Sequence, residues 1–305
     1  MQRDRAWKLK AAAAFAAVYI AWGSTYLVIR IGSMELPPAL FAGLRFLLAA
    51  VLLGVMALAA GQRLPRTWRE WREGAIVGIC MLATANGLVV WGEQWVPSNQ
   101  AALLVATAAL WIAGFGTLGT KGHKLATQTL VGLLIGFVGA TVLLLPAQGF
   151  RVDHLGGQLA ILGSALAWSA GSIYAKRNYG NTALLAAAAI QSLVAGIFLL
   201  GIGVTVGETT RWVWSPTALW TIGYLALLGS CVGYAGYLWL VHNVSPAAFG
   251  TYAYVNPAIA VLLGWLFLGE TLNAVQLIGM AVILIGVVLV SRSLPKRSVL
   301  PTQRR

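Results

Sequence analysis

The sequence predicts an all-α membrane protein in which ten transmembrane helices form two inverted five-helix repeats. Three observations carry this prediction. First, 59% of the 305 residues are hydrophobic and only 10% are charged, against roughly 25% charge in a typical soluble domain. Second, the charges lie between long charge-free stretches, most of which have the length of about 20 apolar residues that a helix needs to cross a bilayer. Third, the second half of the chain resembles the first at a nearly constant offset.

The first half predicts five helices. A helix over 11–30 follows the basic N-terminus, and its apolar run exceeds the roughly 7–15 residues of a signal-peptide core, so we expect it to stay in the protein. A helix over 38–60 begins at Pro37-Pro38 and ends before the arginine-rich segment 62–73. Helices over 74–93 and 98–119 follow, and Lys121 and Lys124 separate them from a fifth helix over 125–147.

The second half predicts helices over 156–176, 183–204, 216–241, 246–269 and 272–291. Two of them come from the charge-free stretch 212–269, whose 58 residues are too many for one span. The segment His242-Asn243-Val244-Ser245-Pro246 divides that stretch at a tight turn. Helices are predicted throughout because the alternating pattern of barrel strands is missing from the sequence and backbone in lipid must satisfy its own hydrogen bonds.

The basic residues predict the orientation of the chain. Seventeen of the 21 Lys and Arg residues lie on one side of the predicted spans. They are Arg3, Arg5, Lys8, Lys10, Arg63, Arg66, Arg69, Arg72, Lys121, Lys124, Lys176, Arg177, Arg292, Lys296, Arg297, Arg304 and Arg305. Only Arg30, Arg151 and Arg211 lie on the other side. By the positive-inside rule both termini are expected in the cytoplasm, as an even number of spans requires.

The net charge of +13 alone would also suit a protein that binds nucleic acid. However, the basic residues form short clusters beside the spans rather than one face, so we expect lipid headgroups and no nucleic acid as their partners. The segment 62–73, with Trp68 and Trp71 among its four arginines, is read as a cytoplasmic loop at the membrane interface. Cys80 and Cys231 fall inside apolar spans without metal-ligand spacing, so neither a metal nor a cofactor is predicted.

An internal repeat divides the chain into residues 1–150 and 151–305, the second unit ending in a basic cytoplasmic tail. At an offset of 146, Trp22 matches Trp168 and Arg45 matches Gln191; at 147, Gly132 matches Gly279. A unit of five spans followed by its copy must insert the copy upside down. Inverted repeats are typical of alternating-access transporters, which bind the solute between the halves near the membrane midplane.

Several motifs carry a resemblance to a known family. They are Ala21-Trp22-Gly23-Ser24-Thr25-Tyr26, the spacing from Pro37-Pro38 to Arg45, Asn256-Pro257, Gly269-Glu270-Thr271-Leu272, and Gly279 to Gly286. In this order, over about residues 11–292, they resemble the EamA family of the drug/metabolite transporter superfamily. The resemblance implies a ten-helix bacterial inner-membrane exporter of amino acids, related metabolites or amphipathic toxic compounds.

Two features of the sequence depart from the pattern of this family. The proline common in the fourth span is missing around Ala109-Leu110, which predicts that the two halves bend differently, and the first span lacks the acidic residue of the small multidrug members.

Arg45 is the one charge well inside a predicted span, and an intramembrane arginine is a functional candidate by default. It lies seven residues after Pro38, about 10 Å into the membrane at 1.5 Å per residue. We predict a cavity role such as binding a carboxylate, with Gln191 as the neutral counterpart. The alternative is a structural arginine that snorkels outward or pairs with Glu35 or Glu93.

Further cavity candidates are polar and aromatic residues within spans, because aromatic walls with a few hydrogen-bonding groups suit an amphipathic or zwitterionic solute. They are Trp22, Ser24, Tyr26, Asn86, Trp91, Trp168, Tyr237, Tyr252 and Asn256, with Tyr174 and Tyr234 in addition. Aromatic residues near span ends have the alternative role of anchors at the membrane interface.

Glu93 and Glu270 are the candidates for proton coupling, with facilitated diffusion as the alternative. Gly132, Gly136, Gly139, Gly279 and Gly286 predict close helix packing.

Two other classes of protein are weighed against a carrier. An intramembrane enzyme would need two membrane aspartates, an H-E-x-x-H motif or a buried Ser with a base, and Asp4 and Asp153 both lie outside the spans. A channel is suggested only by Val232-Gly233-Tyr234, which lies inside a continuous span rather than an unwound filter. We therefore expect a non-enzymatic carrier of a small molecule in the lipid bilayer, present as a monomer or weak homodimer.

Overall fold

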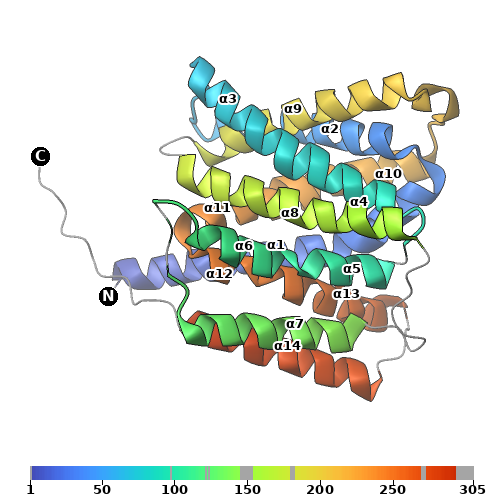
Figure 1. Cartoon of the computed structure of the whole chain (residues 1–305). Helices are drawn as coiled ribbons and strands as arrows, with labels where there is room; N and C mark the ends of the chain where they lie inside the picture. Colours follow the sequence, from blue (N-terminus) through green and yellow to red (C-terminus); the bar gives the residue numbers. More distant parts are fainter. Residues whose placement is uncertain are drawn as a thin grey trace, which may run out of the picture.

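The computed structural model describes residues 2–96, 98–120, 122, 124–144, 154–178, 183–268 and 273–292. The described part of the chain contains helices and no strand, and the helices lie side by side (Figure 1). The first half contains α1 (Gln2–Glu35), α2 (Pro38–Ala59), α3 (Trp68–Val77), η1 (Gly78–Ala85), α4 (Asn86–Gly92), α5 (Ser98–Ala106), α6 (Ala108–Thr117) and α7 (Thr127–Leu144). The second half contains α8 (Leu155–Asn178), α9 (Leu184–Thr205), η2 (Glu208–Arg211), α10 (Pro216–Tyr224), η3 (Leu225–Tyr234), α11 (Ala235–Asn243), α12 (Pro246–Gly250), α13 (Tyr252–Leu268) and α14 (Ala274–Arg292).

These elements form the predicted ten spans, because some spans are built from consecutive segments. The segments α3, η1 and α4 form the third span, α5 and α6 the fourth, α10, η3 and α11 the eighth, and α12 and α13 the ninth. Among the described residues, nine helical segments are long and apolar enough to cross a membrane. The tenth, α8, has 24 residues, or about 36 Å of helix, and is less apolar because it carries glycines, serines and two basic residues in its last turn.

The third span of each half contains a π-helical segment at the same position in the repeat. The segment η1 begins at Gly78 and η3 begins at Leu225, 147 positions later. Such segments loosen the regular helical hydrogen bonding and often lie at functional sites.

The fourth spans are also alike, because they are interrupted at Thr107 and Thr251, whose hydroxyls each bond to the carbonyl three residues earlier. The expectation that the halves bend differently stays a prediction, because Pro257 lies inside α13 whereas α5 and α6 contain no proline.

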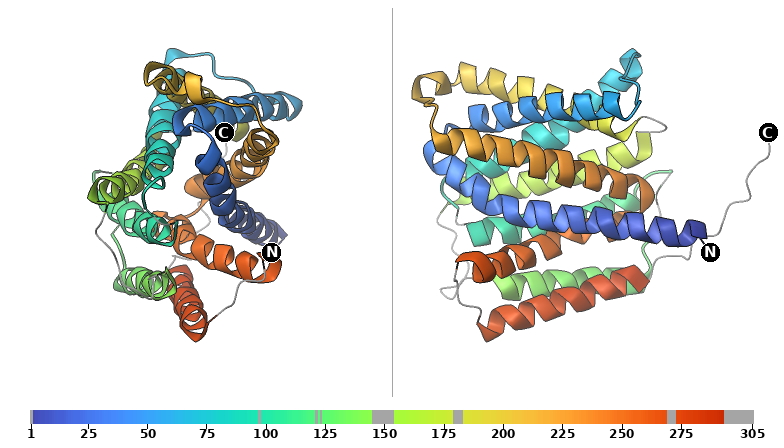
Figure 2. Two further views of the ribbon diagram at one scale, coloured as in Figure 1. Left: turned by 90° about the vertical axis from the view of Figure 1, so that its right-hand side faces the viewer. Right: turned by 180° about the vertical axis from the view of Figure 1, so that it is seen from behind.

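Two pairs of helices join the halves at opposite edges of the molecule. The helices α2 and α9 pack together at one edge, and α7 and α14 at the other (Figures 1 and 2). The second pair confirms the predicted glycine packing. A Cβ atom added to Gly132 would lie 2.9 Å from the carbonyl oxygen of Gly286, and one added to Gly139 would lie 3.0 Å from that of Gly279. Gly132 precedes Gly139 in α7, whereas their partners Gly286 and Gly279 follow the opposite order in α14. The two helices are therefore antiparallel.

Side chains from the adjoining loops cap the helices at the other edge. Glu208 accepts hydrogen bonds from the backbone N–H groups of Ala39 and Leu40, at 3.2 and 2.8 Å, at the start of α2. Gln62 accepts them from Leu185 and Ala186, at 3.0 and 3.3 Å, at the start of α9. The two caps are related by 146 positions, so each half caps a helix of the other half in the same way. They satisfy N–H groups that have no partner within their own helices.

Candidate binding cavity

A cavity of about 120 Å³ lies between the two halves. A single ordered water needs only about 10–15 Å³ on this measure, so the cavity has room for a small organic molecule. Seven of the spans contribute to its wall. The lining residues are Trp22, Thr25, Ile29, Arg45, Phe46, Leu82, Ala85, Asn86, Val89, Val105, Ala108, Ser164, Ala165, Trp168, Gly229, Ser230, Tyr234, Tyr252 and Asn256. Both π-helical segments are among the wall elements, through Leu82 and Ala85 in η1 and through Ser230 in η3.

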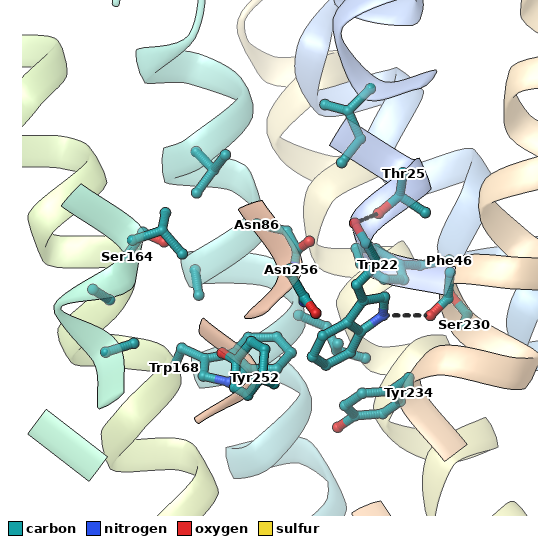
Figure 3. A pocket seen from close by; sticks show the side chains of 18 of the residues that line it. Trp22, Thr25, Phe46, Asn86, Ser164, Trp168, Ser230, Tyr234, Tyr252 and Asn256 are labelled. Carbon is teal, nitrogen blue, oxygen red and sulfur yellow. Dashed lines mark hydrogen bonds between the residues drawn. The ribbon is translucent and has the colours of Figure 1, made fainter. Parts of the chain in front are cut away.

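Aromatic rings close one end of the cavity, and we call the set Trp22, Trp168, Tyr234, Tyr237 and Tyr252 the aromatic floor. The rings of Trp22 and Trp168 meet edge to face with centroids 5.3 Å apart. Trp22 also lies 5.1 Å from both Tyr237 and Tyr252, and Trp168 lies 6.3 Å from Tyr234. Figure 3 shows the Trp22, Trp168, Tyr234 and Tyr252 rings grouped at one end of the cavity, with Thr25 toward the other.

The aromatic floor lies on the side of the cavity that faces the basic ends of the helices. Helix α1 begins at its basic end, and its lining residues run from Trp22 away from that end through Thr25 to Ile29. Helix α8 runs the opposite way and ends in two basic residues, and its lining residues end at Trp168. Trp22 and Trp168 are therefore the last lining residues toward the basic side on both helices.

Hydrogen bonds hold the floor residues in place. The Trp168 indole donates to the Tyr237 hydroxyl at 3.1 Å, and that hydroxyl lies 2.7 Å from the Ser172 hydroxyl. The Trp22 indole donates to the Gly229 carbonyl at 2.9 Å. Tyr234 donates its hydroxyl proton to the buried Gln191. Because these polar groups have partners, the floor is a fixed surface in this conformation.

Arg45 supplies a positive charge to the wall. It is only 7% exposed, and its Nη2 donates to Asn86 Oδ1 at 2.9 Å. Asn86 in turn donates to the Met81 carbonyl at 3.0 Å, which fixes its amide. Within the described part of the chain, no carboxylate forms an ion pair with Arg45, so the alternative pairings with Glu35 and Glu93 are not formed. The buried Nε atom of Arg45 has no hydrogen-bond partner.

Asn256 brings a second unsatisfied group to the cavity. Its side chain is 1% exposed and lines the cavity, and its Oδ1 acceptor has no partner. Buried polar groups in native proteins are nearly always hydrogen-bonded, so Arg45 and Asn256 are unusual among the lining residues in each carrying one buried polar atom without a partner.

The structure places seven of the predicted cavity residues in the cavity wall. They are Trp22, Arg45, Asn86, Trp168, Tyr234, Tyr252 and Asn256. Two more, Tyr237 and Gln191, lie directly behind the wall and bond to its residues. Ser24 lies outside the lining, donates to the Ala21 carbonyl and accepts from Tyr224.

Other predicted residues lie elsewhere. Trp91 is 44% exposed and packs against Trp95 near the end of α4 at 4.7 Å, a position typical of an interface anchor. Glu93 is buried just after α4, outside the lining. The side chain of Tyr26 and the whole of Glu270 lie outside what the structure describes.

Several small or apolar wall residues were not predicted from the sequence. Thr25 and Ile29 follow Trp22 by three and seven positions, and Ser164 precedes Trp168 by four. Helical spacing from each tryptophan would have found all three. In contrast, Ser230 lies in a π-helical segment, where that spacing does not hold.

The sequence of the chain matches known membrane proteins over nearly its full length. A sequence model of the EamA-like transporter family matches residues 9–145 and again residues 155–292. The uncharacterized inner membrane transporter YedA of Escherichia coli strain K12 is 40% identical over 277 residues, which cover 90% of this chain and 88% of that protein.

Two more distant relatives have more specific names. A probable terminal-alkyne amino-acid exporter of Streptantibioticus cattleyicolor is 26% identical, covering 93% of this chain and 94% of the relative. A probable amino-acid metabolite efflux pump of Salmonella typhimurium is 24% identical, covering 88% and 90%. One solved crystal structure superposes with a TM-score of 0.77 over 92% of this chain and 98% of the other, at 23% identity, and supports the fold alone.

Proposed function

The chain belongs to the EamA-like transporter family, and we propose that this inner-membrane transporter exports small amino acids or related metabolites through the cavity between its halves. One observation carries the proposal: a cavity with aromatic and polar walls, built from both halves, is closed by the aromatic floor on the basic side. The names of the amino-acid exporter and the efflux pump among the relatives support the direction and the class of solute.

The mechanism that we propose is alternating access. In the described conformation the lining extends from the aromatic floor away from the basic side, which corresponds to an outward-facing state if the basic side is cytoplasmic. In the opposite state the floor opens and the outer end of the cavity closes. Because the halves are built alike, with equivalent π-helical segments and equivalent caps, the opposite state arises when the two halves exchange their conformations.

We place both termini in the cytoplasm, because the basic residues that start α1 and end α8 lie on one side of the molecule. Fusion of a reporter active only in the cytoplasm, and of one active only in the periplasm, to the C-terminus tests this orientation. Activity of the periplasmic fusion would contradict it.

For energy coupling we retain the two carboxylates predicted from the sequence, Glu93 and Glu270. Replacement by glutamine removes the carboxyl group that binds and releases a proton, without a large change in the shape of the side chain. If either carboxylate carries the coupling proton, its glutamine variant loses proton flux that accompanies the solute. Unchanged proton flux in Glu93→Gln and in Glu270→Gln would leave facilitated diffusion as the explanation.

The transport proposal is tested with purified protein in liposomes. The liposomes are loaded with one labelled amino acid or metabolite at a time, and efflux is followed with and without unlabelled solute outside. A carrier gives saturable efflux that external solute accelerates by exchange. Efflux no faster than from protein-free liposomes across the whole panel would contradict the proposal, and single-channel currents would indicate a channel.

A further inference from the structure

We propose that Arg45 forms a carboxylate-binding subsite, so that the solute has a carboxylate at one end and a compact apolar or aromatic body at the other. This inference rests on the proposed function, because it names the chemistry of the solute that occupies the same cavity. The anchoring residue is Arg45 alone, and solutes that lack a carboxylate are excluded as the preferred cargo.

The charge of Arg45 is the first argument. A guanidinium keeps its proton under any physiological condition, so the wall carries a permanent positive charge. Asn86 offers this charge one neutral hydrogen bond, and no carboxylate among the described residues pairs with it. A buried cation without a counter-charge is costly. A carboxylate in the cavity removes that cost.

The geometry of the guanidinium is the second argument. The Nε–H group of Arg45 is buried and lacks a partner, while Nη2 is held by Asn86. A carboxylate accepts two parallel N–H bonds from a guanidinium, which a monatomic anion does not. Asn86 acts as a positioning residue, because its amide is itself fixed by the Met81 carbonyl in the π-helical segment η1.

The asymmetry between the halves is the third argument. The repeat counterpart of Arg45 is Gln191, whose side-chain oxygen accepts from Tyr234 behind the aromatic floor. Only the first half therefore contributes a cation to the wall, while Trp22, Trp168 and Tyr252 form the apolar end. The small volume of about 120 Å³ fits one short body between the floor and a single carboxylate.

Matched probes test the subsite. Purified full-length protein in lipid nanodiscs is titrated by calorimetry with 3-phenylpropionate, 3-phenylpropionamide and acetate. We expect the acid to bind at least about tenfold more tightly than its neutral amide, and acetate to bind more weakly than 3-phenylpropionate. Equal affinities for acid and amide, or no binding of the acid, would overturn the proposal. Competition by chloride as strong as that by acetate would indicate a general anion site and would also overturn it.

Two variants remove the anion preference in different ways. Arg45→Gln removes the charge, and Asn86→Asp places a carboxylate beside the guanidinium as an internal competitor. Both should bind the acid and the amide with equal affinity, whereas Arg45→Lys should keep part of the preference. Arg69→Gln is the control for loss of a positive charge, because Arg69 is exposed and pairs with Glu73 far from the cavity lining. A wild-type acid preference in folded Arg45→Gln or Asn86→Asp would overturn the assignment.

Failure of this inference differs from failure of the proposed function. Flux of the amide as fast as flux of the acid in liposomes would preserve the transporter and overturn the carboxylate subsite. Selective binding of the acid without any flux would support the subsite and contradict export through the cavity.

Discussion

Trp22 and Trp168 meet edge to face at 5.3 Å, with their ring planes at 80°. They are 146 positions apart, the offset at which the second half repeats the first. The contact is therefore formed by the equivalent tryptophan of each half. Both residues are also the last lining residues toward the basic side on their helices, so the meeting point of the two halves is the floor of the cavity.

The first prediction concerns the hydrogen bond that fixes Trp168. Trp168→Phe keeps an aromatic ring but removes the indole donor to Tyr237. Loss of this bond is worth about 1 kcal/mol, and the floor loses its fixed geometry. We expect solute efflux from liposomes to slow by about three- to tenfold with little change in the amount of folded protein.

The matched change on the other half is Trp22→Phe, which removes the donor to the Gly229 carbonyl. A similar loss is expected, because the two tryptophans occupy equivalent positions. Wild-type efflux in both variants would show that the floor needs only aromatic bulk and no hydrogen bonding.

The sequence predicted the charged, amide and most aromatic wall residues, but it did not predict the small hydroxyl residues Thr25, Ser164 and Ser230. Arg45, Asn86 and Asn256 were identified because polar groups inside a span are costly in lipid and tend to face the bundle interior. Trp91 was placed with them, but tryptophan suits both a cavity and the membrane interface, and the structure puts it near a span end. The choice between those places depends on how a helix is rotated, which the composition of a single helix does not determine.

The helices, too, were predicted only in part. The spans followed from charge-free stretches, since a bilayer requires continuous apolar helices. The π-helical segments η1 and η3 were not predicted, because their sequences are ordinary apolar runs and tertiary packing determines their hydrogen-bond register. Residues such as Ser230 thus entered the wall without a periodic signal.

The second prediction concerns the space in the cavity. Ala165 lines the cavity and is buried on α8. Ala165→Trp fills much of the space that a solute needs, so we expect transport to fall to near the level of protein-free liposomes. Binding of 3-phenylpropionate should weaken by at least about tenfold in the same variant.

Ala170→Trp is the matched control, because Ala170 lies on the same helix with an exposed side chain outside the lining. It adds the same bulk toward the surroundings rather than the cavity, so transport should stay within about twofold of wild type. Equal loss of transport in both variants would contradict a role of the cavity space and would indicate general damage to α8.

The third prediction concerns the glycine contact between α7 and α14. A Cβ atom at Gly286 would lie 2.5 Å from the Gly136 nitrogen and 2.7 Å from the Gly132 carbonyl oxygen. Because both are backbone atoms, the helices must separate, and we expect Gly286→Ala to lower the free energy of unfolding by about 1–3 kcal/mol. Unfolding by titration with a denaturing detergent measures the change.

Gly201→Ala serves as the control for this substitution, since a Cβ atom at Gly201 in α9 meets nothing within 4 Å. There the added methyl group should leave stability unchanged or raise it by about 0.5–1 kcal/mol through helix propensity. A stable Gly286→Ala protein would show that α7 and α14 can move apart without cost.

The fourth prediction concerns the equivalent caps Glu208 and Gln62. Glu208→Ala leaves the N–H groups of Ala39 and Leu40 at the start of α2 without their acceptor, and Gln62→Ala does the same at the start of α9. Loss of a helix cap costs about 0.5–2 kcal/mol, and we expect similar losses in both variants because each cap accepts from two consecutive N–H groups at equivalent positions of the repeat. Glu208→Gln keeps one acceptor oxygen and should cost less than Glu208→Ala. If the free energy of unfolding fell equally in Glu208→Gln and Glu208→Ala, the negative charge at the helix terminus rather than the hydrogen bonds would stabilise α2.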